Sequence, residues 1–346
     1  MKSSGCRFLL AVLTAVFALA GTAHSQQLTK IRFTLDWRYE GHLSFFMMAK
    51  AKGYYEKEGL DVSVDSGAGS VATMNRIVGG SHDIGSADLC SVIEFLGNNP
   101  NMSGRFQAVY LLYNRSPMMI QALKKSGIRK PQDLAGKKMA GPIFDSARKA
   151  FPIYARAIGI DPASVTWVNV DPALRETLLA RGDVDATPGF ELDKLTLMAR
   201  GVKEEDIVTF GYADAGLKLY SNVLLASAKL IEENPKAVAA FVRATNRALI
   251  EAIANPEESV SYTKQFDPLT DPKTGLAKMK ILLRVINTEF AHANGLGAIN
   301  KGDLENQVKE VAAAFALKTV PKADQIFNAS FLPPKSERVP RTPPIR

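Results

Sequence analysis

The stretch IRFTLDWRYEGHLSFFMMAKAKGYYEKEGLDVSV, residues 31–64, decides the fold class, because it joins a strand, a helix and a second strand. Apolar and polar residues alternate at 31–35 and again at 60–64, as they do in strands with one buried face. Between these strands apolar side chains recur at helical spacing, and Gly59 ends the helix. A strand, a helix and a strand in this order predict a parallel pair with the helix packed on one face.

The same alternation continues along the chain. Short strands are predicted at 83–87 and 107–113, and the pattern restarts at 118–123 and runs to Tyr212. After a last apolar strand at 222–226, the chain is predicted to be almost wholly helical. We therefore expect an α/β protein whose sheets are mostly parallel and flanked by helices.

The first 25 residues are predicted to be a signal peptide. Lys2 and Arg7 precede an apolar run at 8–20, which is shorter than the roughly 20 residues of a membrane span. Small residues at 23–25 offer a cleavage site near Ser25, so we expect a periplasmic protein. An uncleaved membrane anchor is the alternative.

Composition narrows the class of protein further. The 346 residues are 46% hydrophobic and 23% charged, which is typical of a folded globular chain. The signal peptide takes two of the eight excess positive charges and one of the two cysteines, which leaves +6 and Cys90. We expect Cys90 to be a buried thiol. The basic cluster at 124–138 has no interleaved aromatic residues, so nucleic-acid binding is not expected.

Recognised catalytic and metal-binding motifs are absent from the sequence. There is no GxxxxGK[ST], GxSxG, HExxH or paired CxxC motif, and the four histidines lack the spacing of metal ligands. No catalytic residue, metal or cofactor is therefore predicted.

Polar and aromatic residues instead gather where predicted strands end. In open α/β sheets, ligands bind beyond the carboxyl ends of the strands. The predicted ligand-binding residues are Asp36, Trp37, His42, Gly69, Ser70, Asp88, Tyr113, Asn114, Asp145, Ser146, Phe190 and Glu191.

Two ligand chemistries stay open on these residues. The loop from Gly67 to Ser70 offers backbone N–H groups and a helix N-terminus to an anion, although a plain turn capped by Ser70 would read the same. Trp37 could stack on a planar ligand while Asp36 binds an amino group. The structural alternatives are an indole that fills the core, a capping role for 145–146 and a core role for Phe190.

Several stretches together resemble one protein family, the periplasmic substrate-binding proteins for sulfonates, taurine, nitrate and thiamine pyrimidine precursors. The matching stretches, which cover nearly the whole mature chain, are 35–42, 51–62, 79–87, 131–138, 180–186 and 234–241. The order and spacing of these stretches carry the resemblance, and they say little about the substrate.

The resemblance implies a two-lobed receptor of the type II periplasmic-binding-protein fold. The chain would cross twice between lobes, with lobe one at 26–117 and 223–332, lobe two at 118–222, and a disordered tail at 333–346. It implies a monomer that closes on a small solute by hinge motion and passes it to an inner-membrane ABC permease. A receptor that feeds a signalling kinase is an open alternative.

An enzyme of the same fold is the other alternative. The fungal thiamine-pyrimidine synthases resemble this chain at Asp36-Trp37 and at 53–60. They carry a sacrificial histidine after the strand near Gly85 and a cysteine-rich stretch in the later crossing. This chain has no histidine at 86–91 and no cysteine at 215–222, so we expect no enzymatic activity.

Overall fold

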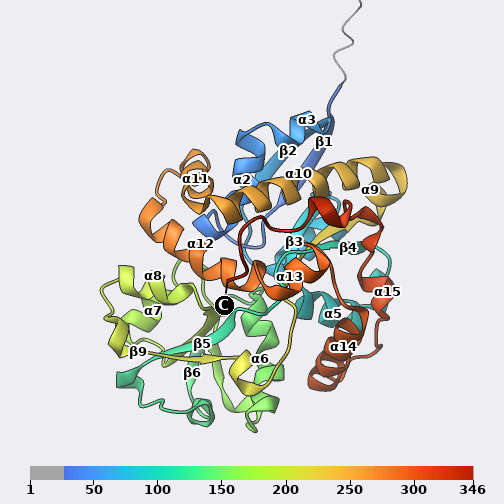
Figure 1. Ribbon diagram of the computed structural model, residues 1–346. Helices are drawn as coiled ribbons and strands as arrows, with labels where there is room; N and C mark the ends of the chain where they lie inside the picture. The colour runs from blue at the N-terminus through green and yellow to red at the C-terminus, as the bar shows by residue number, and fades with distance from the viewer. Residues whose placement is uncertain (1–26, 346) are drawn as a thin grey trace, which may run out of the picture.

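The computed structural model describes residues 27–345, which form two α/β lobes (Figure 1). The chain passes between the lobes at 112–117 and returns at 212–221. The two-lobed fold and both crossings are therefore confirmed. The predicted signal peptide lies outside the described residues.

The sheet of the first lobe has five strands, with β3 (Ile84–Asp88) at its centre. In spatial order they are β2 (Leu60–Asp65), β1 (Thr29–Thr34), β3, β10 (Asn222–Ser227) and β4 (Phe106–Leu111). Strand β1 pairs in parallel with β2 and β3, and β10 pairs antiparallel with β3 and β4. Four strands thus share one direction, and the reversed strand is the one that returns from the second lobe.

The sheet of the second lobe repeats this plan. Its strands, in spatial order, are β7 (Thr166–Val168), β6 (Lys138–Ala140), β8 (Ala186–Phe190), β5 (Met118–Leu123) and β9 (Ile207–Gly211). Strand β6 is parallel to β7 and β8, and β5 is antiparallel to β8 and β9. The reversed strand is again the first one after a crossing, so the prediction of mostly parallel sheets is confirmed in both lobes.

Helices cover both sheets, and most of the later ones lie with the first lobe (Figure 1). The helices before the second lobe are α2 (Ser44–Ala51), α3 (Tyr54–Lys57), α4 (Ser70–Val78) and α5 (Leu89–Asn98). Those of the second lobe are α6 (Ser146–Ala157), α7 (Arg175–Arg181) and α8 (Asp193–Ala199). Those after it are α9 (Ala228–Glu233), α10 (Pro235–Ala254), α11 (Pro256–Ser261), α12 (Pro272–Ile286), α13 (Glu289–Asn294), α14 (Lys301–Phe315) and α15 (Ala323–Ile326).

Local sequence explains where the helices begin. Asn234 accepts a hydrogen bond from the Ala237 N–H at the start of α10, and Pro235 takes the first helical position, where its missing N–H costs nothing. Pro152 lies inside α6, which begins at Ser146, so this proline does not mark the start of the helix.

The prediction of a disordered tail is wrong for residues 333–345. The buried Arg338 guanidinium donates to the carbonyls of Pro333 (2.7 Å) and Leu296 (2.5 Å), and the Ile345 N–H donates to the Asn287 carbonyl (2.8 Å). Proline and charge content suggested disorder. These backbone contacts order the segment instead, and composition does not reveal them. The exact lobe boundaries stay predictions.

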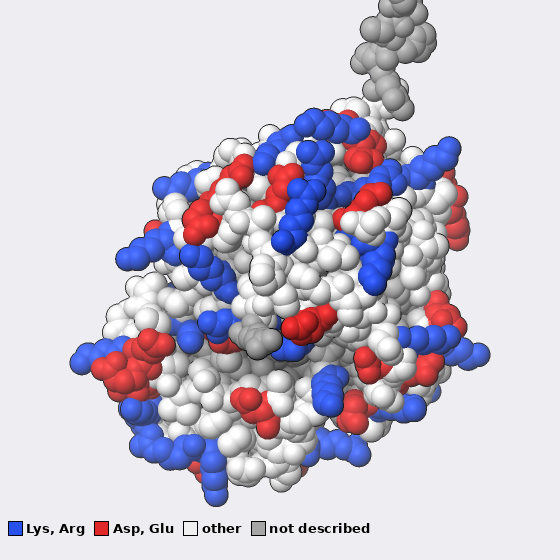
Figure 2. Space-filling model, in the orientation of Figure 1, with Lys and Arg blue, Asp and Glu red and all other residues white. Residues whose placement is uncertain are grey.

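The hydrophobic core is continuous between the lobes. One cluster of buried side chains joins the first lobe's sheet to the sheet and α6 of the second lobe, and Phe190 packs against this cluster and against the cluster under α10. In residues 27–345, no helix is both long and apolar enough to span a bilayer. Lysine and arginine are interspersed with acidic side chains over the face shown in Figure 2.

Candidate functional site

A cavity of about 30 Å³ lies between the lobes, where strands of both sheets end. This is room for about one or two water molecules, so the lobes are closed on one another. Eight of the twelve predicted ligand-binding residues line the cavity, together with four other residues. The lining residues are Asp36, Trp37, His42, Gly69, Ser70, Asp145, Ser146, Arg175, Gly189, Phe190, Leu192 and Asp193.

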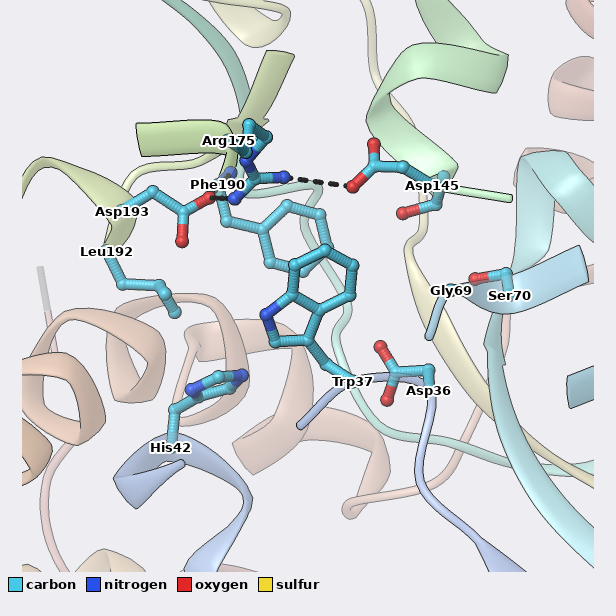
Figure 3. Close-up of a pocket in the computed structure, with 12 residues that line it drawn as sticks. Asp36, Trp37, His42, Gly69, Ser70, Asp145, Arg175, Phe190, Leu192 and Asp193 are labelled. Carbon is cyan, nitrogen blue, oxygen red and sulfur yellow. Dashed lines mark hydrogen bonds and ion pairs between the residues drawn. The ribbon is translucent and has the colours of Figure 1, made fainter. Parts of the chain in front are cut away.

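Two aromatic side chains, one from each lobe, line the cavity. Trp37 follows strand β1 and is half-buried, and Phe190 is the last residue of β8 (Figure 3). The Arg175 guanidinium lies over the indole, 5.0 Å from the ring centroid. The indole therefore faces a flat, nitrogen-rich group in the closed form, which is the geometry that a planar ligand would need.

Arg175 is the centre of a buried ionic cluster. Its Nη1 lies 2.9 Å from Asp145 Oδ2 and its Nη2 lies 2.6 Å from Asp193 Oδ2 (Figure 3). Its Nε lies 2.6 Å from Glu176 Oε1. Burial raises the pKa of Asp145 and of Asp193, and the guanidinium only partly opposes it. Three carboxyl groups thus share one cation, so acid is in excess on this side of the cavity.

Asp145 has two roles at once. It is the N-cap of α6, where its Oδ1 accepts the Arg148 N–H at 2.8 Å, and its Oδ2 binds Arg175. The sequence left capping and ligand contact as alternatives. The structure places the capping carboxylate on the wall of the cavity.

Asp36 is held from inside the first lobe. Its Oδ1 accepts from Ser86 Oγ (2.7 Å) and its Oδ2 accepts from Asn222 Nδ2 (2.7 Å), while its own N–H donates to Ser86 Oγ (2.9 Å). These bonds fix the turn that carries Trp37. The carboxylate therefore has less capacity for a ligand amino group than the sequence suggested.

The glycine loop is where the two lobes touch through their backbones. Gly69 has φ +122°, and a Cβ added there would lie 2.2 Å from the Phe144 carbonyl oxygen of the second lobe. The Val71 N–H points at this same oxygen at 3.4 Å, and the Gly69 N–H donates to the Asp36 carbonyl at 2.7 Å. Two N–H groups of the loop thus already donate to carbonyl oxygens of the protein.

Ser70 is the first residue of α4, and Gly69 occupies the N-cap position. The prediction that Ser70 is the N-cap is therefore wrong by one residue. Its hydroxyl instead accepts the Asp88 N–H at 2.8 Å, so it links the start of α4 to the end of β3 within the first lobe.

His42 lies in a buried charged cluster at the edge of the cavity. Its Nδ1 is 3.6 Å from Glu40 Oε2, which also pairs with Lys278 Nζ at 2.6 Å. Burial lowers the pKa of His42 to about 4, although the Glu40 carboxylate opposes this. Lys278 lowers the pKa of Glu40 to about 2 against the effect of burial. At neutral pH the imidazole is therefore an uncharged hydrogen-bonding group.

Four predicted residues lie outside the cavity lining. Asp88 caps the start of α5, and Asn114 bonds to the backbone at the end of α12. Tyr113 is wholly buried, and its hydroxyl has no hydrogen-bond partner among the described residues. Glu191 faces Arg284 in a long ion pair of 3.5 Å.

Arg175, Leu192 and Asp193 are the lining residues that sequence reasoning missed, whereas Gly189 belongs to the predicted strand end that carries Phe190. Arg175 begins α7 after a loop that follows β7, and Asp193 begins α8. In the sequence, the only sign that Arg175 and Asp193 could line the site was their place at a predicted helix start beyond a strand end. The same signal pointed to Glu191, whose side chain turns away.

The prediction of a buried thiol is confirmed, because Cys90 is free and buried. Its Sγ accepts from Gln307 Nε2 at 3.2 Å, and burial raises the pKa of the thiol. Among the residues that the structure describes, no three His, Cys, Asp or Glu side chains are placed to hold a metal ion.

The buried Asp88 predicts a pH dependence of stability. Burial raises the pKa of Asp88 to about 7, above the value of about 4 in an unfolded chain. The folded state then binds more protons in this window, so its stability falls as pH rises from about 4 to about 7. Asp88→Asn keeps the capping acceptor and should flatten this part of the curve of unfolding free energy against pH. A curve unchanged from the parent would show that Asp88 does not titrate there.

Comparisons with known proteins place the chain in a family. It is 26% identical over 323 residues to the riboflavin-binding protein RibY of Chloroflexus aurantiacus, which covers 91% of this chain and 90% of that one. It is 23% identical over 253 residues to the 4-amino-5-hydroxymethyl-2-methylpyrimidine phosphate synthase of Legionella pneumophila, with 71% and 76% covered.

The fold matches that of a solved receptor. The alkanesulfonate-binding protein SsuA of Xanthomonas axonopodis pv. citri, solved bound to MOPS, superposes with a TM-score of 0.67 at 16% identity and covers 86% of this chain and 96% of that one. This likeness shows the fold of a solute-binding receptor. A family model described as NMT1/THI5 like matches residues 41–259, and the chain therefore belongs to the NMT1/THI5-like family.

Proposed function

We propose that this chain is a periplasmic receptor that binds a small planar nitrogen heterocycle between its lobes and delivers it to an inner-membrane ABC permease. The observation that carries the proposal is an aromatic cavity in which buried carboxyl groups outnumber cations. Trp37 and Phe190 supply the flat surfaces, while Asp193 supplies Oδ1 as an acceptor for an N–H group, because its bonds to Arg175 and to the Phe190 N–H both end on Oδ2. A ligand with several N–H donors suits such a site.

An anionic ligand, the other chemistry suggested by the sequence, is less well supported. Arg175 is the one cation among the lining residues, and each of its nitrogens already faces a carboxylate. His42 is uncharged at neutral pH, since its pKa is about 4. Two N–H groups of the glycine loop already donate to protein carbonyls. A sulfonate would have to displace these partners and then lie beside excess acid, which is unfavourable.

The relatives support a heterocycle and leave two kinds of activity to choose between. One is named for riboflavin binding and another for the synthesis of a pyrimidine phosphate. We propose a receptor rather than a synthase, because residues 86–91 lack histidine and residues 215–222 lack cysteine. The signal-like N-terminus favours an exported receptor.

Closure of the lobes is the proposed mechanism. The cavity has room for about one or two water molecules, so a solute must enter while the lobes are apart. A solute that bridges Trp37 of the first lobe and Asp193 of the second would stabilise the closed form, because it contacts both. The closed receptor would then present one fixed surface to a permease.

Trp37→Ala should weaken binding of a planar solute by about 5- to 150-fold and leave most of the stability. The indole is half-buried and lies on the cavity wall, and loss of one stacking face costs about 1–3 kcal/mol. Thermal-shift measurements with 4-amino-5-hydroxymethyl-2-methylpyrimidine, riboflavin, taurine and nitrate test this directly, because a bound solute raises the melting temperature.

The matched control is Trp167→Ala, which removes the other tryptophan of the chain. Trp167 packs edge-on against Phe151 in the second lobe, and it does not line the cavity. It should lower the melting temperature without changing the response to solutes. If Trp37→Ala loses much stability and binds like the parent, Trp37 is a core residue. If no solute shifts the parent protein, the receptor proposal fails.

A further inference from the structure

Asn222 links the cleft to both crossings between the lobes. It is the first residue of β10, directly after the second crossing, and it is wholly buried. We infer that Asn222 is a positioning residue that couples the angle between the lobes to the placement of Trp37. The inference deepens the proposed function. The importance of Asn222 for solute binding rests on that function.

The backbone of Asn222 holds the first crossing. Its carbonyl oxygen accepts the N–H groups of Leu112 (2.8 Å) and Tyr113 (3.2 Å), which directly follow β4. In the same register the Ser221 N–H donates to the Tyr113 carbonyl at 3.1 Å. The two crossings are thus fastened to each other at residues 221–222, and movement of one displaces the other.

The side chain of Asn222 reaches the cleft. Its Nδ2 donates to Asp36 Oδ2 at 2.7 Å, and Asp36 directly precedes Trp37. Both partners are buried. A hydrogen bond to a charged group is stronger than a neutral one, and an unpaired buried carboxylate oxygen is costly. A shift of the start of β10 should therefore also shift the turn that carries the Trp37 indole.

A second chain of hydrogen bonds leads from Ser221 to the glycine loop. Ser221 Oγ donates to Asp88 Oδ2 at 2.9 Å, and the Asp88 N–H donates to Ser70 Oγ at 2.8 Å. Ser70 follows Gly69, which touches the second lobe. Both first-lobe loops that line the cavity are thus bonded to residues 221–222. The loops that would contact the solute are thus linked to the two crossings through buried hydrogen bonds as well as through packing.

The experiment needs no solute, so its outcome is independent of which ligand binds. In a Trp167→Phe background, Trp37 is the sole tryptophan of the mature chain, and acrylamide quenching of its fluorescence reports its exposure. Spin labels on Lys30→Cys and Lys203→Cys, exposed residues of the two lobes, report the interlobe distance. Cys90 is buried and should not be labelled.

Asn222→Ala should change both readouts together. The coupling requires the bond from Asn222 Nδ2 to Asp36 Oδ2 to be stronger in the closed form than in the open form. Its loss should therefore lower the ratio of closed to open molecules about tenfold, with longer label distances and stronger quenching of Trp37. The matched control is Asn246→Ala, which removes another buried amide, bonded to Tyr110 Oη (2.9 Å) and the Glu337 carbonyl (2.8 Å), neither of which belongs to a crossing.

Asn222→Ser gives the same test if the alanine variant does not fold. Ser86→Ala removes the other side-chain donor to Asp36 without touching a crossing, so it should change Trp37 quenching and leave the interlobe distances as in the parent. The inference is overturned if Asn222→Ala matches Asn246→Ala in both readouts, or if only one readout changes. Failure of every solute in the thermal-shift panel would defeat the receptor proposal but would leave this result intact.

Discussion

Gly69→Ala is expected to weaken solute binding by about 100-fold or more while both lobes stay folded. A Cβ at this position would lie 2.2 Å from the Phe144 carbonyl oxygen of the opposite lobe. Backbone atoms cannot give way as a flexible side chain can, so the closed form is blocked. Residue 69 also has φ +122°, a conformation that costs a non-glycine residue about 1–3 kcal/mol. Small-angle scattering should show a larger radius of gyration than that of the parent.

Gly80→Ala separates the two causes. Gly80 also has positive φ, +73°, but no atom lies within 4 Å of the added Cβ. This variant should lose some stability through backbone strain and keep the parent's closure. If Gly69→Ala closes and binds like the parent, the backbone contact between the lobes does not limit closure.

Arg175→Met is expected to lower the free energy of unfolding by about 3–5 kcal/mol at neutral pH, as when one partner of a buried ion pair is removed. Asp145, Asp193 and Glu176 would lose their shared cation in a buried site. Denaturant unfolding measures this loss. The exposed Arg181, at the other end of α7, pairs with Asp183 at 3.0 Å, and Arg181→Met should cost less than about 1 kcal/mol.

The loss at Arg175 should depend on pH. Burial already holds the pKa of Asp145 and Asp193 above the ordinary value. The folded state therefore binds more protons than the unfolded chain above that value, and stability falls as pH rises through this window. Without the guanidinium the shift is larger, so the variant should be closer to the parent at pH 5 than at pH 8. An equal deficit at both values would mean that loss of the guanidinium does not change how many protons these carboxyl groups bind in the folded state between pH 5 and pH 8.

Periodicity was sufficient for the order of strands and helices, because most strands are short with buried residues and the longer helices have an apolar face. The alternation at 60–64 became β2, and the Asn234-Pro235 pair became the start of α10. The segment 333–345 was mispredicted, since its order depends on carbonyls that Arg338 meets from distant parts of the chain. Contacts of this kind leave no periodic trace in a sequence.

The site was predicted as far as strand ends define it. Asp36, Trp37 and Asp145 directly follow strands or cap the next helix, and all three line the cavity. Arg175 lies seven residues beyond the end of β7, and only the loop conformation returns it to the cleft. Glu191 precedes α8 and points away, because the direction of a side chain past a strand end depends on the turn that follows.

The central claim is that an aromatic, acid-rich cleft selects a planar nitrogen heterocycle over an anion. Titration of the mature protein in the Trp167→Phe background, followed by the fluorescence of Trp37, tests it most directly. The account predicts that 4-amino-5-hydroxymethyl-2-methylpyrimidine or riboflavin changes the emission with a Kd of about micromolar or tighter, and that MOPS and taurine change nothing. Tight binding of a sulfonate, with both heterocycles inert, would contradict it.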